Sequence, residues 1–192
     1  MSNGKGDFLD DRRKSLEDAF FKKEEQKKVA KLREKLKQQT VREELLKASG
    51  MTDEGVLDKL VELGLTADTV VALSLCPLVH VAWADGQIQE NEHDAILKAA
   101  QGKGIEQGDP AFALLSEWLN SPEPPDLLPA WSAYVVALGE EMTSDQYAML
   151  KEQIIDFAHA VASAAGGVLG IKSISKAEKT ALAEIARAFG DK

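Results

Sequence analysis

Acidic residues gathered around one Asp-Gly pair are the part of this sequence best suited to chemistry. In the stretch 80–97, HVAWADGQIQENEHDAIL, Asp85 is followed within seven positions by Glu90 and Glu92. Carboxylate oxygens are the ligands that hard divalent cations prefer. The three side chains therefore form a candidate site for calcium, zinc or manganese.

The fit to a calcium loop is partial. If Gly86 takes the glycine position of an EF-hand loop, then Asp85 and Glu92 fall on two of its ligand positions. Two further ligand positions fall on Val81 and Trp83, which offer no side-chain oxygen. The same residues also suit a plain turn, with Asp85 accepting a backbone hydrogen bond and Gly86 at positive φ. Both interpretations stay open at this point.

Two carboxylate and imidazole pairs at i, i+3 spacing offer a rival metal site. They are Glu90 with His93 and Asp156 with His159, the spacing by which helical bundles hold two iron or manganese ions. Such centres also need single glutamates from two other helices, which the apolar segments do not supply. We expect His159 to lie in the core instead.

Catalytic motifs are not found in the sequence. It has no Gly-x-Ser-x-Gly, His-Glu-x-x-His or Cys-x-x-Cys pattern. The stretch GGVLGIKS lacks the glycine before lysine that a phosphate loop needs, and we interpret it as a connection between helices. We therefore predict no enzymatic activity and no cofactor other than a divalent cation.

The elements that must position these residues are helices. Apolar residues recur with a 3.6-residue period, and no stretch alternates with the period of two that strands show. We expect Thr52 and Thr66 to cap the second and third helices, and Pro77 to bend the third. The helices expected are 7–48, 52–63, 66–84, 90–101, 110–119, 127–138, 143–165 and one after residue 174.

An internal repeat relates two of these helices. IQENEHDAILKAAQGKG and ISKAEKTALAEIARAFG begin 86 residues apart and share the spacing of isoleucine, glutamate and aliphatic residues. Ser175 and Glu178 form a capping box in the second copy, and Gln89 and Glu92 take the same places in the first. Since an apolar helix precedes each copy, two paired-helix units should pack face to face in a compact bundle.

This pattern resembles the TerB-like domain of tellurite-resistance proteins and of a DnaJ-like membrane co-chaperone, over residues 66–190. The resemblance implies an all-helical domain, sometimes credited with metal binding, tied to stress-response assemblies and without established enzymatic activity. The second copy has AAGGVLGIKS where the family often has another Asp-Gly. The residues that match are Ala84, Asp85, Gly86, Ile88 and Glu92 in the first half, and Ile174, Ser175 and Glu178 in the second.

Charge divides the chain into a basic arm and an acidic body. The 192 residues carry a formal charge of −9, and residues 1–50 hold 14 basic and 10 acidic residues, a charge of +4. Residues 51–192 hold 9 basic and 22 acidic residues, a charge of −13. We predict these two ranges as the domains: a long amphipathic helical arm and a TerB-like body. The acidic body argues against nucleic acid as a partner.

The remaining features indicate a soluble, intracellular chain. The longest apolar run has about 15 residues, whereas a membrane span needs about 20. The single cysteine, Cys76, lies in that run and suits a reducing compartment, so we expect a cytoplasmic location and a buried thiol. The start of the arm is also similar to a small helical inhibitor of the F1-type ATPase, through Asp11, Arg12, Glu17 and Phe20.

The sequence therefore predicts a non-catalytic interaction module, related to stress responses, that binds protein partners through its basic arm or a groove of the bundle. Peripheral contact with anionic lipid through the arm is compatible with the same charges. The alternative is a divalent-metal sensor or buffer at the Asp85–Gly86 turn.

Overall fold

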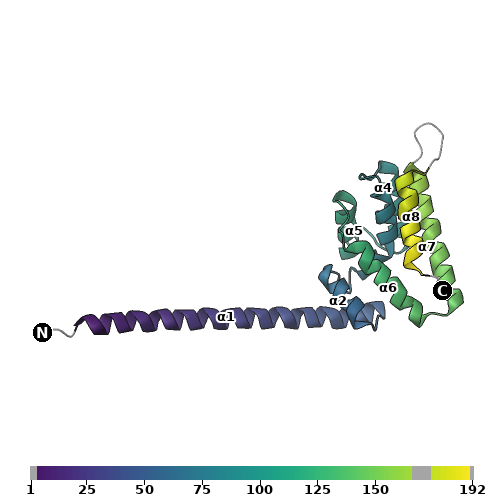
Figure 1. The fold of residues 1–192 in the computed structure, drawn as a ribbon. Helices are drawn as coiled ribbons and strands as arrows, with labels where there is room; N and C mark the ends of the chain where they lie inside the picture. Colours follow the sequence, from purple (N-terminus) through teal and green to yellow (C-terminus); the bar gives the residue numbers. More distant parts are fainter. Residues whose placement is uncertain (1–3, 166–173, 191–192) are drawn as a thin grey trace. The chain divides into compact units, whose positions relative to one another are not determined.

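The computed structural model describes residues 4–165 and 174–190, and every regular element within them is a helix. The predicted all-α class is confirmed. Eight α-helices and one 3-10 helix lie in the described residues, in the order α1 (Gly4–Ser49), α2 (Glu54–Glu62), η1 (Val70–Leu75), α3 (Cys76–Ala82), α4 (Glu90–Gly102), α5 (Pro110–Asn120), α6 (Leu127–Glu141), α7 (Ser144–Ala165) and α8 (Lys176–Ala188) (Figure 1).

The chain divides into two compact units, Met1–Val41 and Arg42–Lys192. The first consists of the long helix α1 up to Val41, where Val29 and its apolar neighbours along the helix are half exposed. The second begins within the last turns of α1. There Leu45 is fully buried, and Arg42 lies 3.1 Å from a carboxylate oxygen of Asp58.

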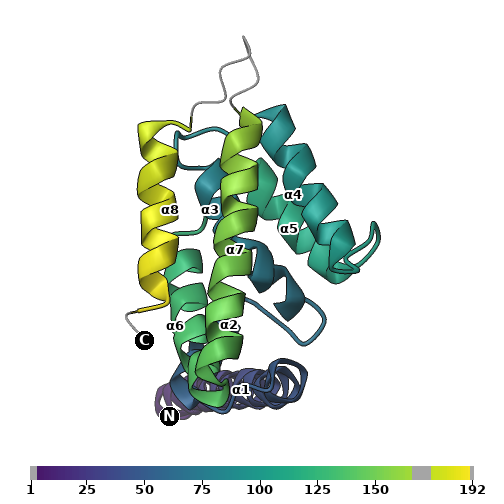
Figure 2. The ribbon, with the colours of Figure 1, turned by 90° about the vertical axis from the view of Figure 1, so that its right-hand side faces the viewer.

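The second unit is a helical bundle built around α3. This short helix contacts η1, α4, α6, α7 and α8, and its side chains from Cys76 to Val79 are almost entirely buried. The helix α7 lies between α4 and α8 and contacts both, with α3 behind it (Figure 2). The part of the apolar run that forms α3 thus lies at the centre of the bundle.

The expected bent helix over residues 66–84 is instead two separate helices. The segment Val70–Leu75 is a 3-10 helix, and α3 begins at Cys76 with Pro77 in its first turn. Proline has no N–H to donate, but the first turn of a helix needs no such donor, so the chain starts a new helix there. Cys76 is fully buried as predicted, and burial raises the pKa of its thiol well above the usual value.

Two predicted helix caps are wrong by a few residues. Asp53 caps α2 in place of Thr52, because its carboxylate accepts a hydrogen bond of 2.9 Å from the N–H of Val56. Thr66 does not cap a helix directly. Its N–H donates to the hydroxyl of Thr69 at 2.8 Å, which closes a turn just before η1.

Other helices begin or end at residues that suit those positions. Asp109 precedes the proline that opens α5, and Thr143 and Gln146 bond reciprocally at the start of α7. Gly50 and Gly64 follow α1 and α2 at positive φ. The glycine-rich stretch 166–173 lies outside the described residues.

None of the described helices is both long and apolar enough to span a membrane.

An aromatic cluster joins α6, α7 and the end of α8. Phe189 lies edge-on to Trp131 with ring centroids 5.8 Å apart, and 5.5 Å from the ring of Tyr147. The hydroxyl of Tyr147 donates to the carbonyl of Phe189 at 3.1 Å. Gly139 provides the space for this ring, since a Cβ there would lie 2.6 Å from Tyr147. The cluster fixes α8 against the other two helices.

Candidate functional site

The Asp85–Gly86 turn has the geometry expected of a turn. Gly86 has a φ of 91°, in the region that favours glycine, and a carboxylate oxygen of Asp85 accepts the N–H of Gln87 at 3.2 Å. Asp85 itself is exposed. The predicted turn geometry is therefore confirmed. The turn connects α3 to α4.

Both predicted capping boxes are present, and both bury a glutamate. Glu92 accepts the N–H of Gln89 at 2.9 Å, and Glu178 accepts the N–H of Ser175. The side chains of Glu92 and Glu178 are only 2% and 5% exposed, although buried carboxylates are rare unless they are paired. These exposures make the two capping glutamates the only buried charged residues of the described chain.

The two glutamates also affect each other. Burial raises the pKa of Glu92, the hydrogen bond from Gln89 lowers it, and the negative charges of Glu178 and then Asp85 raise it, with a net value of about 7. A charge shifts the pKa of another group only when the distance between them is short or the solvent screens their interaction poorly. Carboxylates from both copies of the repeat thus contribute to the raised pKa of Glu92.

The predicted metal ligands are placed differently from one another. Glu92 is buried, whereas Asp85 and Glu90 are exposed. Within residues 4–165 and 174–190, no three His, Cys, Asp or Glu side chains are grouped so that they could hold a metal ion. Metal binding by Asp85, Glu90 and Glu92 stays a prediction.

The rival di-metal pairs have little burial. His159 and Asp156 are exposed on α7, so the expectation that His159 lies in the core is wrong. Its position on α7 faces away from the neighbours that bury Ala158 and Val161. His93 is partly exposed and lies 3.8 Å from Asp94, its neighbour in the chain.

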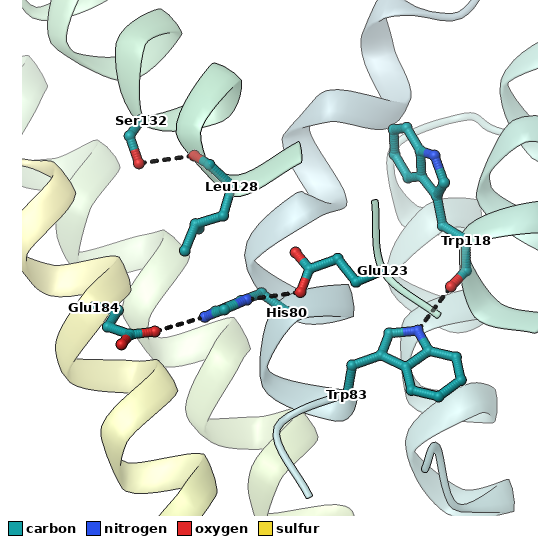
Figure 3. Close-up of polar contacts among 7 residues, drawn as sticks. All are labelled: His80, Trp83, Trp118, Glu123, Leu128, Ser132 and Glu184. Atoms are coloured by element: carbon teal, nitrogen blue, oxygen red, sulfur yellow. Dashed lines mark hydrogen bonds and ion pairs between the residues drawn. The ribbon is translucent and has the colours of Figure 1, made fainter. Parts of the chain in front are cut away.

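A polar contact that crosses the bundle is centred on His80 of α3 (Figure 3). The Nδ1 atom lies 2.8 Å from a carboxylate oxygen of Glu123, in the loop between α5 and α6, and Nε2 lies 3.0 Å from Glu184 of α8. Both ring nitrogens must carry a proton to donate to two carboxylates, so the imidazole is positively charged in this arrangement. His80 therefore connects three elements.

The charges around His80 favour its protonated form. Burial lowers the pKa of His80, but the hydrogen bond and charge of Glu123, and then those of Glu184, outweigh it, so the pKa is raised. The second oxygen of Glu123 is buried and has no hydrogen-bond partner among residues 4–165 and 174–190. This orphaned oxygen makes the loop carboxylate dependent on the imidazolium for its stabilisation.

The same part of the bundle contains a second polar contact, between the end of α3 and α5. Nε1 of Trp83 donates to the carbonyl of Trp118 at 2.8 Å, which joins the end of α3 to α5 (Figure 3). Trp118 and Trp131 are buried and Trp83 is half buried.

Sequence reasoning did not find the His80 network. Its partners lie 43 and 104 residues away along the chain, so no local spacing marks them. The signal that was available is Glu123 itself, a charged residue held between prolines in SPEPPD. The convergence of Glu92 and Glu178 had a clearer signal in the 86-residue repeat.

Comparison with protein-family models, curated proteins and solved structures finds no match. The resemblance to TerB-like domains, and that of the arm to an F1-ATPase inhibitor, therefore stay predictions. The side chains of Asp11, Arg12, Glu17 and Phe20 lie outside what the structure describes.

Proposed function

We propose that this chain is a non-catalytic, TerB-like protein-interaction module of the cytoplasm, related to stress responses, which binds protein partners through its basic arm. The observation that carries this proposal is an apolar stripe on α1. Val29, Leu32 and Leu36 lie at i, i+3 and i+7 and are 49%, 58% and 55% exposed. Exposed apolar residues in register on one helix face are a common mode of helix recognition between proteins.

Charge supports a protein partner with acidic groups. Residues 22–42 hold nine Lys and Arg and three Glu, a formal charge of +6. Such a segment attracts acidic surfaces and raises association rates at low salt. The stripe is a narrow row of three side chains along the helix, as in helix pairing. Helices that lie in lipid usually present a broad apolar face with aromatic residues.

The repeat supports the TerB-like assignment. The units α3–α4 and α7–α8 contact each other, and their capping boxes lie at equivalent positions. These features agree with the packing of two paired-helix units that the repeat predicts.

A substitution in the full chain tests the proposal. We expect Leu32→Asp with Leu36→Asp to abolish capture of partner proteins from native lysate, while helix content by circular dichroism is unchanged. Ala30→Asp with Gln38→Asp, at exposed positions of α1 away from the stripe, adds the same charge and is the control. Equal capture of partner proteins by the stripe variant and the wild type would overturn the proposal. So would a stripe variant that loses binding to anionic vesicles but still captures the same proteins.

Truncation gives a second test, and the structure determines where to cut. Leu45 is fully buried in the second unit, so a deletion should end at Val41 and keep Arg42 onward. The chain 42–192 should unfold cooperatively and capture no partner.

The alternative function is a divalent-metal sensor or buffer at the Asp85–Gly86 turn, and the observation that favours it is the effect of the charges of Glu178 and Asp85 on the pKa of Glu92. Calcium, zinc or manganese bound there would favour the ionised carboxylates. Calorimetry should then detect binding below the millimolar range that is lost in Asp85→Asn with Glu92→Gln. Equal heat in both proteins would exclude this site.

A further inference from the structure

The apolar stripe on α1 is flanked by positive charge on both sides. In the register that places Val29 and Leu36 at equivalent positions, the neighbouring positions hold Lys28, Arg33 and Lys35. In paired helices these flanking residues face the partner helix. Two copies of the stripe packed on each other would therefore oppose lysine to lysine, which is unfavourable. The surface that covers the stripe must be apolar in the middle and acidic at its edges.

The chain itself has such a surface on α7, which we call the α7 hollow. It has a volume of about 570 Å³, and its apolar part is formed by Met142, Met149 and Leu150. Met149 is 69% exposed, the largest value among the exposed large hydrophobic residues of the described chain. Glu152 and Asp156 supply the charge, and none of the described residues that line the hollow is basic. Methionine side chains are flexible and polarizable, and are common on surfaces that accept helices.

We propose that the stripe of one copy packs into the α7 hollow of a second copy, with Lys28, Arg33 and Lys35 facing Glu152 and Asp156. Apolar residues and charges are then complementary in the same contact. We assign the contact to a second copy on the match of apolar residues and opposite charges between the two surfaces, and a contact within one chain is one of the outcomes of the test below. Two chains related by a two-fold axis would make the contact twice.

The inference rests on the proposed function, since it names what the arm binds in the absence of another protein. A contact made by three side chains buries less surface than the ~1,200 Å² in total that most stable interfaces bury. The dimer should therefore be weak and sensitive to salt, and acidic partner helices should compete with it for the stripe.

Sedimentation equilibrium of the purified full chain tests the proposal, without any lysate. We expect the mass to rise from monomer to dimer between about 10 and 500 μM in 50 mM salt, with at least tenfold weaker association in 500 mM salt. Lys28→Glu with Lys35→Glu should weaken association at least tenfold. Lys27→Glu with Lys31→Glu, on the opposite face of the helix, changes the net charge equally and should leave it nearly intact.

A charge exchange identifies the surface. Mixed with Lys28→Glu, Lys35→Glu protein, a Glu152→Lys, Asp156→Lys variant should form a heterodimer, although each variant alone is largely monomeric. A monomer at every concentration, equal effects of the two lysine pairs, or no rescue on mixing would each overturn the inference. Cross-linking a mixture of ¹⁴N and ¹⁵N protein distinguishes contacts within one chain from contacts between chains. Cross-links between the arm and α7 that occur only within one chain would also overturn the inference. Partner capture that persists in a strictly monomeric chain would overturn only this inference and leave the proposed function in place.

Discussion

The contact of His80 with two carboxylates predicts a large loss of stability in His80→Leu. Leucine has a similar volume and a high helix propensity, so the change removes the charge and donors with little effect on α3. Breaking a buried ion pair by removing one partner costs about 3–5 kcal/mol. The side chains of His80 and Glu123 remain 17% and 16% exposed, which favours the lower end. Glu184 is 42% exposed and should add less than about 1 kcal/mol. We expect a total loss of about 3 kcal/mol.

The loss should depend on pH. The folded-state pKa of His80 is raised above its ordinary value of 6.5. A group with a raised pKa contributes stability that is fully present below its unfolded pKa and is lost as pH rises through the folded one. The difference between wild type and His80→Leu should therefore be largest at pH 6 and should decrease towards pH 9 as the imidazole of the wild type loses its proton.

Urea unfolding followed by circular dichroism at pH 6 and pH 9 measures both differences. The matched control is His93→Leu, because His93 is partly exposed and its nearest carboxylate is 3.8 Å away. That variant should change the free energy of unfolding by less than about 0.5 kcal/mol at either pH. A loss in His80→Leu that is equal at the two pH values, or no larger than that of His93→Leu at pH 6, would refute the reasoning.

Two further predictions concern the capping glutamate and the aromatic cluster. The pKa of Glu92 is raised to about 7 in the folded state. Between pH 4.5 and 7 this side chain therefore ionises in the unfolded state but stays largely protonated in the folded one, which should lower the free energy of unfolding of the wild type by about 3 kcal/mol. Glu92→Gln keeps an acceptor for the N–H of Gln89 and should largely flatten that pH profile of unfolding, whereas an unchanged slope would contradict it. Gly139→Ala forces a Cβ against the ring of Tyr147 and should cost about 1–3 kcal/mol in the same assay. Gly102→Ala, with open space around it in α4, should be neutral or stabilising by up to about 1 kcal/mol, and similar effects at the two glycines would contradict this.

The sequence was sufficient to predict the helices because their boundaries depend on local chemistry. The capping boxes at Gln89 and Ser175 act within one helical turn, and each was found where it was expected. The errors arose where two local signals compete. Pro77 suits either a bend or a helix start, and only the surrounding packing decides between them.

The contacts at the candidate sites could not be predicted in the same way. His80 joins α3 to residues in two distant segments, and an apolar helix containing one histidine does not indicate which carboxylates it meets. For His159 the same pattern suggested burial, yet this residue is exposed. Which side of an apolar helix faces solvent depends on its neighbours in space, and the sequence of a single chain does not provide these.

The convergence of Glu92 and Glu178 follows from the repeat itself. Each capping box requires a glutamate in the first turn of its helix, where the partial positive charge of the helix N-terminus stabilises a carboxylate. Packing two such units face to face brings the two first turns close enough for one charge to act on the other. The boxes stabilise α4 and α8 separately, while their proximity opposes full ionisation of the pair. A proton on Glu92, or a cation between the two carboxylates, relieves the same repulsion, so protonation and metal binding should compete at this position.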